Sequence, residues 1–156
     1  MKVLVTGPDG LLGSNLIREL LNRGYSVTAM TENDKKSLTI ENLPIQRIVA
    51  NLLDTQAIIN ATVGMDTVIH CAASTSMFPA RSEIINKINI GGTQNIVDAC
   101  KKNKVKGLIY VGTANSFSSG NLHNLGTEKN LYSSENYGLD YMDSKYKAQL
   151  IVLENA

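Results

Sequence analysis

A tyrosine and a lysine four residues apart, Tyr141 and Lys145, are the side chains in this sequence best suited to moving a proton. On a helix, positions i and i+4 share one face, so the phenol and the ammonium can serve one site. A neighbouring ammonium favours the phenolate over the neutral phenol, which makes a tyrosine a usable general acid and base. The spacing alone is also compatible with an aromatic ring packed beside the aliphatic part of a lysine side chain.

A second motif has residues suited to binding a phosphate. Gly7, Gly10 and Gly13 lie between a short apolar segment, residues 3–6, and a segment with helical periodicity, residues 12–23. The first glycine allows a tight turn, the second lets backbone N–H groups approach a pyrophosphate, and the third lets the helix pack closely against the sheet. The helix N-terminus adds unpaired N–H donors. No Gly-Lys-Ser or Gly-Lys-Thr follows, so the loop of a kinase or nucleoside triphosphatase is not expected.

Strands and helices alternate along the chain and must position these motifs. Short apolar segments predict strands at residues 3–6, 25–30, 44–49, 67–71 and 107–112. Segments with a 3.6-residue period predict helices at residues 12–23, 55–62, 82–102 and 140–155, and a polar loop covers residues 115–138. This alternation predicts an α/β fold, a doubly wound parallel sheet covered by helices on both faces, with strand order 3-2-1-4-5.

Several of the chemically useful residues fall at one edge of this predicted sheet. In an open α/β sheet, ligands bind beyond the carboxyl ends of the strands, where the strand order reverses. For the predicted order that point lies between the first and fourth strands. Gly7, the Cys71-Ala72-Ala73 segment and Thr113 follow the first, fourth and fifth strands. We therefore expect them to converge on one crevice.

The Gly-x-x-Gly-x-x-Gly loop and the Tyr-x-x-x-Lys pair together resemble the short-chain dehydrogenase/reductase superfamily, in its extended branch of epimerases, dehydratases and dihydroflavonol-reductase-like enzymes. The resemblance runs through essentially the whole chain. It implies a Rossmann fold and an NAD(P)-dependent oxidoreductase that transfers hydride between C4 of the nicotinamide and a carbonyl carbon. In such an enzyme Tyr141 would exchange a proton with the substrate oxygen, and Lys145 would also bind the nicotinamide ribose.

The same resemblance implies two further active-site residues. Thr113, in the segment Val111-Gly112-Thr113-Ala114, matches the catalytic hydroxyl of the family's Ser-Ser-Ala segment and would hydrogen-bond the substrate oxygen. Gly112 departs from the usual serine, which leaves this edge of the site less constrained. Without the resemblance, Thr113 would be interpreted as a residue that begins a turn. Asn89 matches the family's Asn-x-x-Gly-Thr segment and would support the active-site geometry, through a water.

The resemblance also assigns contacts to the cofactor. Small residues in the His-x-Ala-Ala segment would let the cofactor lie against the backbone, and His70 within it is expected to be structural. Asn51 and Leu52 stand where relatives hold the adenine, usually with Asp at the Asn51 position. The residues assigned to the cofactor are Gly7, Gly10, Leu11, Leu12, Gly13, Thr31, Glu32, Asn51, Leu52, Cys71, Ala72, Ala73, Tyr141 and Lys145.

The choice between NAD and NADP depends on the residues after the second strand. NAD-preferring relatives carry Asp at the position of Thr31, whereas NADP-preferring relatives have Arg nearby. Here Glu32 could accept hydrogen bonds from the ribose hydroxyls and would repel a 2′-phosphate, which favours NAD. Lys35 and Lys36 could offset that repulsion. The expected cofactor is therefore NAD or NADP, with NAD favoured.

Members of the extended branch are longer than this chain, which ends after the Tyr-x-x-x-Lys helix. We therefore expect residues 1–156 to form one NAD(P)-binding Rossmann domain without the C-terminal substrate domain. A nucleotide-sugar epimerase or dehydratase is one alternative function. A non-catalytic dinucleotide-binding or redox-sensing module is another: the short length favours it, and the presence of Tyr141 and Lys145 argues against it.

Composition and charge narrow the environment and the partners. The chain has 43% hydrophobic and 19% charged residues and a net charge of +1 without a basic run, so a nucleic-acid partner is not expected. No apolar run approaches the ~20 residues that span a bilayer, and no signal peptide precedes the first strand, so we expect a cytoplasmic protein with no membrane partner. Cys71 and Cys100 lack metal-ligand spacing and are expected to be reduced core thiols.

Two kinds of partner are expected. The resemblance implies a small-molecule substrate that carries a carbonyl or an alcohol. It also implies a homodimer, because in family dimers the helices that correspond to residues 82–102 and 140–155 pack against a second subunit.

Overall fold

A parallel sheet of five strands carries the glycine loop. The strands are β1 (Lys2–Thr6), β2 (Ser26–Thr31), β3 (Gln46–Val49), β4 (Thr67–His70) and β5 (Gly107–Tyr110). Their order is β3-β2-β1-β4-β5 and every pairing is parallel, which confirms the predicted topology. β4 and β5 end earlier than predicted because the ladder ends at the pair His70–Tyr110. The segments that follow them belong to the carboxyl edge of the sheet.

The computed structural model describes residues 1–34 and 37–156, which form two units. The sheet unit comprises Met1–Ala73 and Asn95–Val111 and contains the whole sheet. The second unit comprises Ser74–Gln94 and Gly112–Ala156. Lys35 and Lys36, which the sequence analysis weighed against Glu32, lie outside the described residues.

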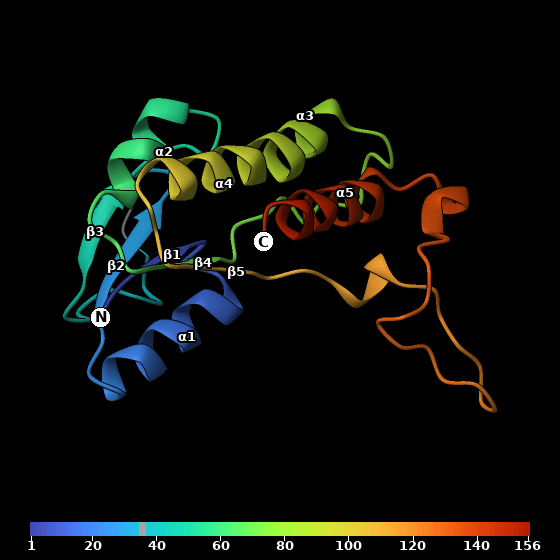
Figure 1. Ribbon diagram of the computed structural model, residues 1–156, viewed down its shortest axis with the longest axis horizontal. Helices are drawn as coiled ribbons and strands as arrows, with labels where there is room; N and C mark the ends of the chain where they lie inside the picture. The colour runs from blue at the N-terminus through green and yellow to red at the C-terminus, as the bar shows by residue number, and fades with distance from the viewer. Residues whose placement is uncertain (35–36) are drawn as a thin grey trace. The chain divides into compact units, whose positions relative to one another are not determined.

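Helices cover both faces of the sheet (Figure 1), as the alternation predicts. Val3 and Val5 of β1 face α1 (Leu11–Asn22), where they are buried with Ile17. Leu4 points to the opposite face because successive strand residues alternate. It is buried there with side chains of α2 (Thr55–Thr62) and of the part of α4 (Gly92–Lys102) that belongs to the sheet unit; these are Ile58, Ala61, Ile96, Ala99 and Cys100.

The helices α1 and α2 begin in different ways. α2 begins after Asp54, whose carboxylate accepts a hydrogen bond from the N–H of Ala57 at 2.9 Å and so caps the helix. α1 begins after Gly10, which has no side chain to cap it, and within residues 1–34 and 37–156 no side chain caps α1 and its first turn holds no acidic residue. The N–H groups at the start of α1 therefore keep their capacity to bind an anion.

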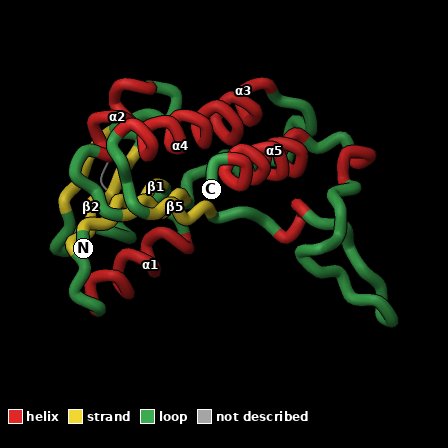
Figure 2. Tube along the Cα trace, viewed as in Figure 1, coloured by secondary structure: helices red, strands yellow, loops and turns green. Residues whose placement is uncertain are grey.

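The second unit is built from helical segments and loops. The predicted helix at residues 82–102 is a continuous helical path, but it consists of α3 (Glu83–Asn86), the π-helix η1 (Lys87–Gly91) and α4. The predicted polar loop holds two short 3-10 turns, η2 (Ala114–Ser116) and η3 (Ser134–Tyr137). The last helix is α5 (Asp140–Glu154), which contacts α3, η1, η2 and η3. Figure 2 shows the long loops between these short helical turns.

Two observations bear on the environment of the chain. Within residues 1–34 and 37–156 neither cysteine is in a disulfide; Cys100 is buried, as expected of a core thiol, whereas Cys71 is only half-buried. Burial raises the pKa of the Cys100 thiol to about 11. Cys100 therefore stays protonated and unreactive at neutral pH. Across the described part of the chain, no helix combines the length and the apolar character that crossing a membrane would require.

Candidate functional site

The glycine loop is shaped by two close backbone approaches. Gly7 has φ +63°, and a Cβ atom there would lie 2.8 Å from the backbone nitrogen of Ala72. A Cβ atom on Gly13 would lie 2.1 Å from the carbonyl oxygen of Gly7. Gly13 thus lets the first turn of α1 rest on the loop that leaves β1, a contact that was not predicted from the sequence. Both positions exclude any larger residue for reasons internal to the fold.

Gly10 differs from the other two glycines because its surroundings are open. A Cβ atom on Gly10 would meet only the carbonyl oxygen of Gly7, at an ordinary distance of 3.5 Å. Gly10 is exposed, and the side chains of Leu11 and Leu12 that follow it are 87% and 51% exposed. The protein therefore leaves space above the loop at Gly10, where an anion could approach the backbone N–H groups of α1.

A buried hydrogen-bonded pair fixes the turn that faces the glycine loop. Oγ1 of Thr6, at the end of β1, lies 2.7 Å from Nδ1 of His70, at the end of β4. The same oxygen accepts a hydrogen bond from the N–H of Ala72 at 3.1 Å. His70 is 1% exposed, in agreement with the structural role expected for it. Cys71, Ala72 and Ala73 follow as a half-buried turn, and Ala72 is held where it meets Gly7.

The residues assigned to the ribose and the adenine lie at the carboxyl ends of β2 and β3. Thr31 is half-buried and Glu32 is exposed. Oδ1 of Asn51 accepts the N–H of Leu53 at 2.8 Å, so the other side of this amide presents an N–H donor. The carbonyl of Leu52 accepts a hydrogen bond from the Asn95 side chain at 2.8 Å, which ties this loop to α4.

Tyr141 and Lys145 lie one turn apart on α5, in the second unit. Lys145 is only 4% exposed, whereas Tyr141 is half-buried. The residue between them that faces the neighbouring helix is Ser144, which is fully buried. Its hydroxyl donates to the carbonyl of Tyr141 at 3.0 Å.

The side chain of Asn89 makes three direct hydrogen bonds. Oδ1 of Asn89 accepts the N–H of Ser74 at 2.7 Å, and Nδ2 donates to the carbonyl of Ser74 at 3.0 Å and to Oγ of Ser144 at 2.9 Å. Asn89 lies within the π-helix η1 and is 2% exposed. Its amide therefore joins the loop that begins at Ser74 directly to the helix that carries Tyr141 and Lys145.

Thr113 begins the turn η2, as the alternative interpretation of a turn-initiating residue predicted. Its Oγ1 accepts a hydrogen bond from the N–H of Asn115 at 3.3 Å, which makes it the N-cap of η2. Accepting that bond uses a lone pair of the hydroxyl and not its proton. The geometry is therefore compatible both with a turn residue and with a hydroxyl that donates to a ligand.

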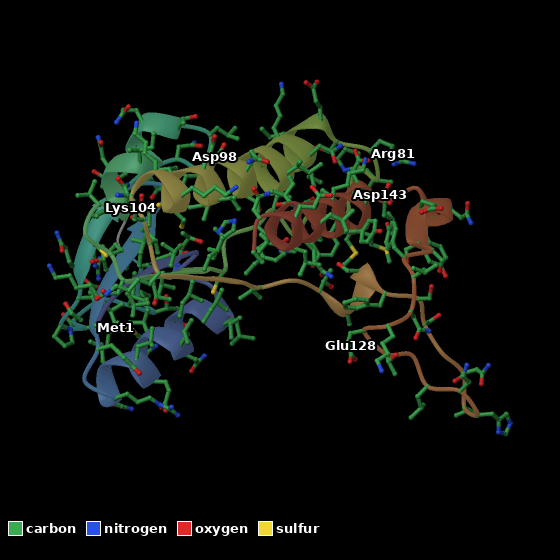
Figure 3. The ribbon with its side chains drawn as sticks, viewed as in Figure 1. Met1, Arg81, Asp98, Lys104, Glu128 and Asp143 are labelled. Atoms are coloured by element: carbon green, nitrogen blue, oxygen red, sulfur yellow. The ribbon has the colours of Figure 1, made fainter. Side chains whose placement is uncertain are left out.

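Five charged or aromatic side chains around the first two turns of α5 were assigned no role from the sequence. Nη1 of Arg81 donates to Oδ1 of Asp140 at 2.9 Å and to Oδ2 of Asp143 at 3.1 Å (Figure 3). The phenol of Tyr132 donates to Oδ1 of Asp143 at 2.5 Å, and its ring stacks on Tyr146 with centroids 4.1 Å apart. Burial and the bond to Asp143 raise the pKa of Tyr132, so its phenol stays neutral. Acidic residues are common in the first turn of a helix, so the presence of Asp140 and Asp143 in the sequence did not indicate these contacts.

The predicted site residues fall into two groups. The glycine loop, the residues after β2 and β3 and the turn after β4 belong to the sheet unit. Asn89, Thr113, Tyr141 and Lys145 belong to the second unit. Asn89 is hydrogen-bonded to Ser74 and to Ser144 of α5, and neither bond was predicted from the sequence.

Comparison with known proteins shows one matching family model and several similar relatives. The model of the 3-beta hydroxysteroid dehydrogenase/isomerase family matches residues 4–156. The 2-alkyl-3-oxoalkanoate reductase of Stenotrophomonas maltophilia (strain K279a) is 33% identical over 113 residues, which cover 72% of this chain and 33% of the reductase.

Solved structures share the fold. The crystal structure of gox2253 has a TM-score of 0.87 at 26% identity, with 97% of this chain and 46% of that chain covered. The UDP-glucose 4-epimerase of Thermus thermophilus, solved in complex with NAD, has a TM-score of 0.85 at 23% identity, with 99% and 50% covered. The chain thus spans about a third of the length of that reductase and about half of these structures.

Proposed function

The chain belongs to the 3-beta hydroxysteroid dehydrogenase/isomerase family, within the extended short-chain dehydrogenase/reductase superfamily, and we propose that it provides the cofactor site and proton-transfer residues of an NAD(P)-dependent oxidoreductase. Its substrate is a small-molecule carbonyl compound or the corresponding alcohol. Because the related reductase is named for 2-alkyl-3-oxoalkanoates, the first substrate to test is ethyl 2-methyl-3-oxobutanoate, called here the keto-ester probe.

The observation that carries the proposal is the burial of Lys145 one turn after Tyr141. Lysine side chains are almost never fully buried unless they are paired, because removing an ammonium from water is costly. Lys145 is 4% exposed, on a helix that is held at Ser144 by Asn89. A buried lysine one turn from a tyrosine in a dinucleotide-binding fold supports a role in stabilising the phenolate.

The residues around α1 fit a dinucleotide. The start of α1 has no side-chain cap within the described chain, and the space around Gly10 is open, so the pyrophosphate could accept hydrogen bonds from backbone N–H groups. When bound, the dinucleotide supplies or accepts hydride at C4 of its nicotinamide.

The chain's own residues then handle the substrate oxygen and its proton. The hydroxyl of Thr113 donates a hydrogen bond to that oxygen, which orients the carbonyl. Tyr141 gives its phenolic proton to the oxygen in the reduction and takes the proton back in the oxidation. Lys145 stabilises the phenolate that remains on Tyr141 in the reduction.

Glu32→Gln tests whether Glu32 contacts the ribose of the cofactor. We expect the chain to bind NADH at micromolar concentration and to bind NADPH more weakly. Glu32→Gln should weaken NADH binding about tenfold, because a charge-assisted hydrogen bond to a ribose hydroxyl is lost. The same change should strengthen NADPH binding about fivefold, because the repulsion between a carboxylate and a 2′-phosphate disappears. Calorimetric titration of each variant with each dinucleotide measures both effects.

Asp34→Asn is the matched control, since Asp34 is another exposed carboxylate on the same segment to which no ribose contact is assigned. It should change neither affinity by more than about twofold, the scale of a screened surface charge. Equal effects of the two substitutions would remove the role of Glu32. Failure of the unmodified chain to bind either dinucleotide would contradict the proposed cofactor site.

We propose that the chain forms a homodimer, in which α3 and α5 contact a second copy of the chain. Each of these helices keeps an apolar side chain in solvent: Ile84 is 53% exposed and Leu153 is 61% exposed. Sedimentation velocity should give twice the mass of one chain, and Ile84→Asp should shift the population to monomers because it places a charge in an apolar contact. Ile109→Asp is the control, since Ile109 on β5 is 54% exposed but lies outside both helices. A monomer at all concentrations would contradict this partner.

A further inference from the structure

The start of α5 is held by a neighbouring chain segment instead of by its own cap. Leu139 occupies the N-cap position and, in the described part of the chain, forms no side-chain capping bond. The N–H of Asp140, the first residue of the helix, donates instead to the carbonyl of Ala80 at 2.9 Å. The first turn of α5 therefore depends on the segment that precedes α3.

The side chain of Asp140 makes a second contact with the same segment. Its Oδ2 accepts the N–H of Ser82 at 2.6 Å, and Ser82 is the N-cap residue of α3. Asp140 is 8% exposed, so this is a charge-assisted hydrogen bond largely withdrawn from water. The hydrogen bond from Ser82, together with the Arg81 guanidinium, holds the pKa of Asp140 below its ordinary value of 3.8 and keeps the carboxylate charged at neutral pH. One side chain of α5 thus caps the beginning of another helix.

A second connection joins the same two helical paths one turn farther along. Asn89 of η1 donates to Ser144 of α5 at 2.9 Å. Tyr141 lies in the first turn of α5, next to the contact made by Asp140, and Lys145 lies next to the contact made by Ser144. The spacing between the phenol and the ammonium therefore depends on both connections. The one at Asp140 joins the first residue of α5 to the segment before α3, and the one at Ser144 reaches the same turn through the carbonyl of Tyr141.

We propose that Asp140 is a positioning residue for Tyr141: its carboxylate joins the N-terminal ends of α3 and α5 and so fixes the first turn of α5. The inference deepens the proposed function and rests on the role assigned there to Tyr141. Without this carboxylate, the first turn of α5 frays and the phenol of Tyr141 leaves its place relative to Lys145.

The hydrogen bond to Ser82 carries this role, and the ion pair to Arg81 is secondary. The Arg81 side chain is 62% exposed, and ion pairs with such an exposed partner contribute little because water screens them. The N–H of Ser82 has a nearly buried acceptor in Asp140, and removing such an acceptor leaves the donor without its bond. Substitutions at the two residues should therefore differ in effect.

The test follows the environment of Tyr141 directly, without requiring turnover. The full chain is labelled with tyrosine carrying ¹³C at Cζ, and Tyr141→Phe identifies the Tyr141 signal among those of the six tyrosines. Asp140→Ala should shift and broaden that signal and speed hydrogen exchange of the Ser82 amide about tenfold. Asp140→Asn should leave the signal near its original position, because the amide oxygen still accepts the Ser82 N–H. Arg81→Gln should leave it unchanged.

Turnover and cofactor affinity give the second readout. With NADH and the keto-ester probe, Asp140→Ala should lower kcat about tenfold without changing the Kd for NADH, and Asp140→Asn should restore kcat to within about threefold. Should Asp140→Ala fail to fold, Asp140→Glu replaces it. The longer side chain keeps the charge beside Arg81 but is a poor cap, so it should still shift the Tyr141 signal.

Three outcomes would overturn the inference. The first is an unshifted Tyr141 signal in a folded Asp140→Ala or Asp140→Glu variant, and the second is an equal shift in Arg81→Gln. The third is an unchanged kcat in an Asp140→Ala variant whose melting temperature falls, the result expected of a merely structural role. Failure of the proposed function would appear differently, as turnover that survives Tyr141→Phe.

Discussion

Replacing Tyr141 by phenylalanine is expected to lower turnover of the keto-ester probe by about 10²- to 10⁴-fold, the usual contribution of a positioned general acid or base. Phenylalanine keeps the ring and removes only the phenolic oxygen, so packing on α5 is retained. The affinity for NADH should stay within about twofold, because one neutral hydroxyl contributes little to a dinucleotide held mainly at its phosphates. Steady-state kinetics and calorimetry on the same preparation measure the two effects.

Tyr146→Phe is the matched control for this experiment. Tyr146 lies on the same helix, next to Lys145, and its ring stacks on Tyr132. Losing its hydroxyl should leave turnover within about twofold, the effect of removing a group that takes no part in proton transfer. Turnover that is unchanged in Tyr141→Phe, or equally reduced in both variants, would contradict the catalytic assignment and favour a non-catalytic dinucleotide-binding module.

Gly13→Ala is expected to abolish NADH binding and to destabilise the chain. The new Cβ atom would lie 2.1 Å from the carbonyl oxygen of Gly7 and 3.0 Å from Cα of Pro8. Both neighbours are backbone atoms, so the overlap can be relieved only if the loop moves, at a cost of about 3 kcal/mol or more in the free energy of unfolding. A displaced loop no longer aims its N–H groups at a pyrophosphate, and affinity should fall more than about 100-fold. Urea unfolding and NADH titration are the measurements.

Gly10→Ala separates binding from stability. Its Cβ atom would meet only the carbonyl oxygen of Gly7, at 3.5 Å, so the free energy of unfolding should change by less than about 1 kcal/mol. The methyl group would nevertheless occupy the open space in which the pyrophosphate must approach, and NADH binding should still be lost. If Gly10→Ala binds NADH normally, the dinucleotide does not lie over this part of the loop.

The fold was predictable because its signals are local. The helix expected at residues 55–62 is found at Thr55–Thr62, since an Asp cap and a helical period both lie in adjacent residues. The strand order followed from the alternation of strands and helices around a glycine loop that opens the first helix. Each of these inferences needs only residues that are close together in the sequence.

The contacts that hold the candidate site could not be predicted in this way. The bond between Asp140 and the N–H of Ser82 joins residues 58 positions apart, and its donor is a backbone group that leaves no trace in the sequence. Asn89 was predicted to support the site, but its direct bond to Ser144 depends on how η1 and α5 pack. The close approach of Gly13 to the carbonyl oxygen of Gly7 depends on the path of the loop, which the glycine spacing does not specify. The π-helix around Asn89 likewise has no local signature in Lys87–Gly91.

The bare start of α1 has a consequence for anyone who wishes to make this protein more heat-resistant. Placing Asp or Ser at position 10 is the standard way to stabilise such a helix, and α2 already has this arrangement at Asp54. At α1, however, the added oxygen would occupy the donors on which the dinucleotide depends, and an Asp would also repel its phosphates. Here thermal tolerance and function compete for the same N–H groups. Engineering for robustness should therefore leave the glycine loop unchanged and seek its gains in other parts of the chain.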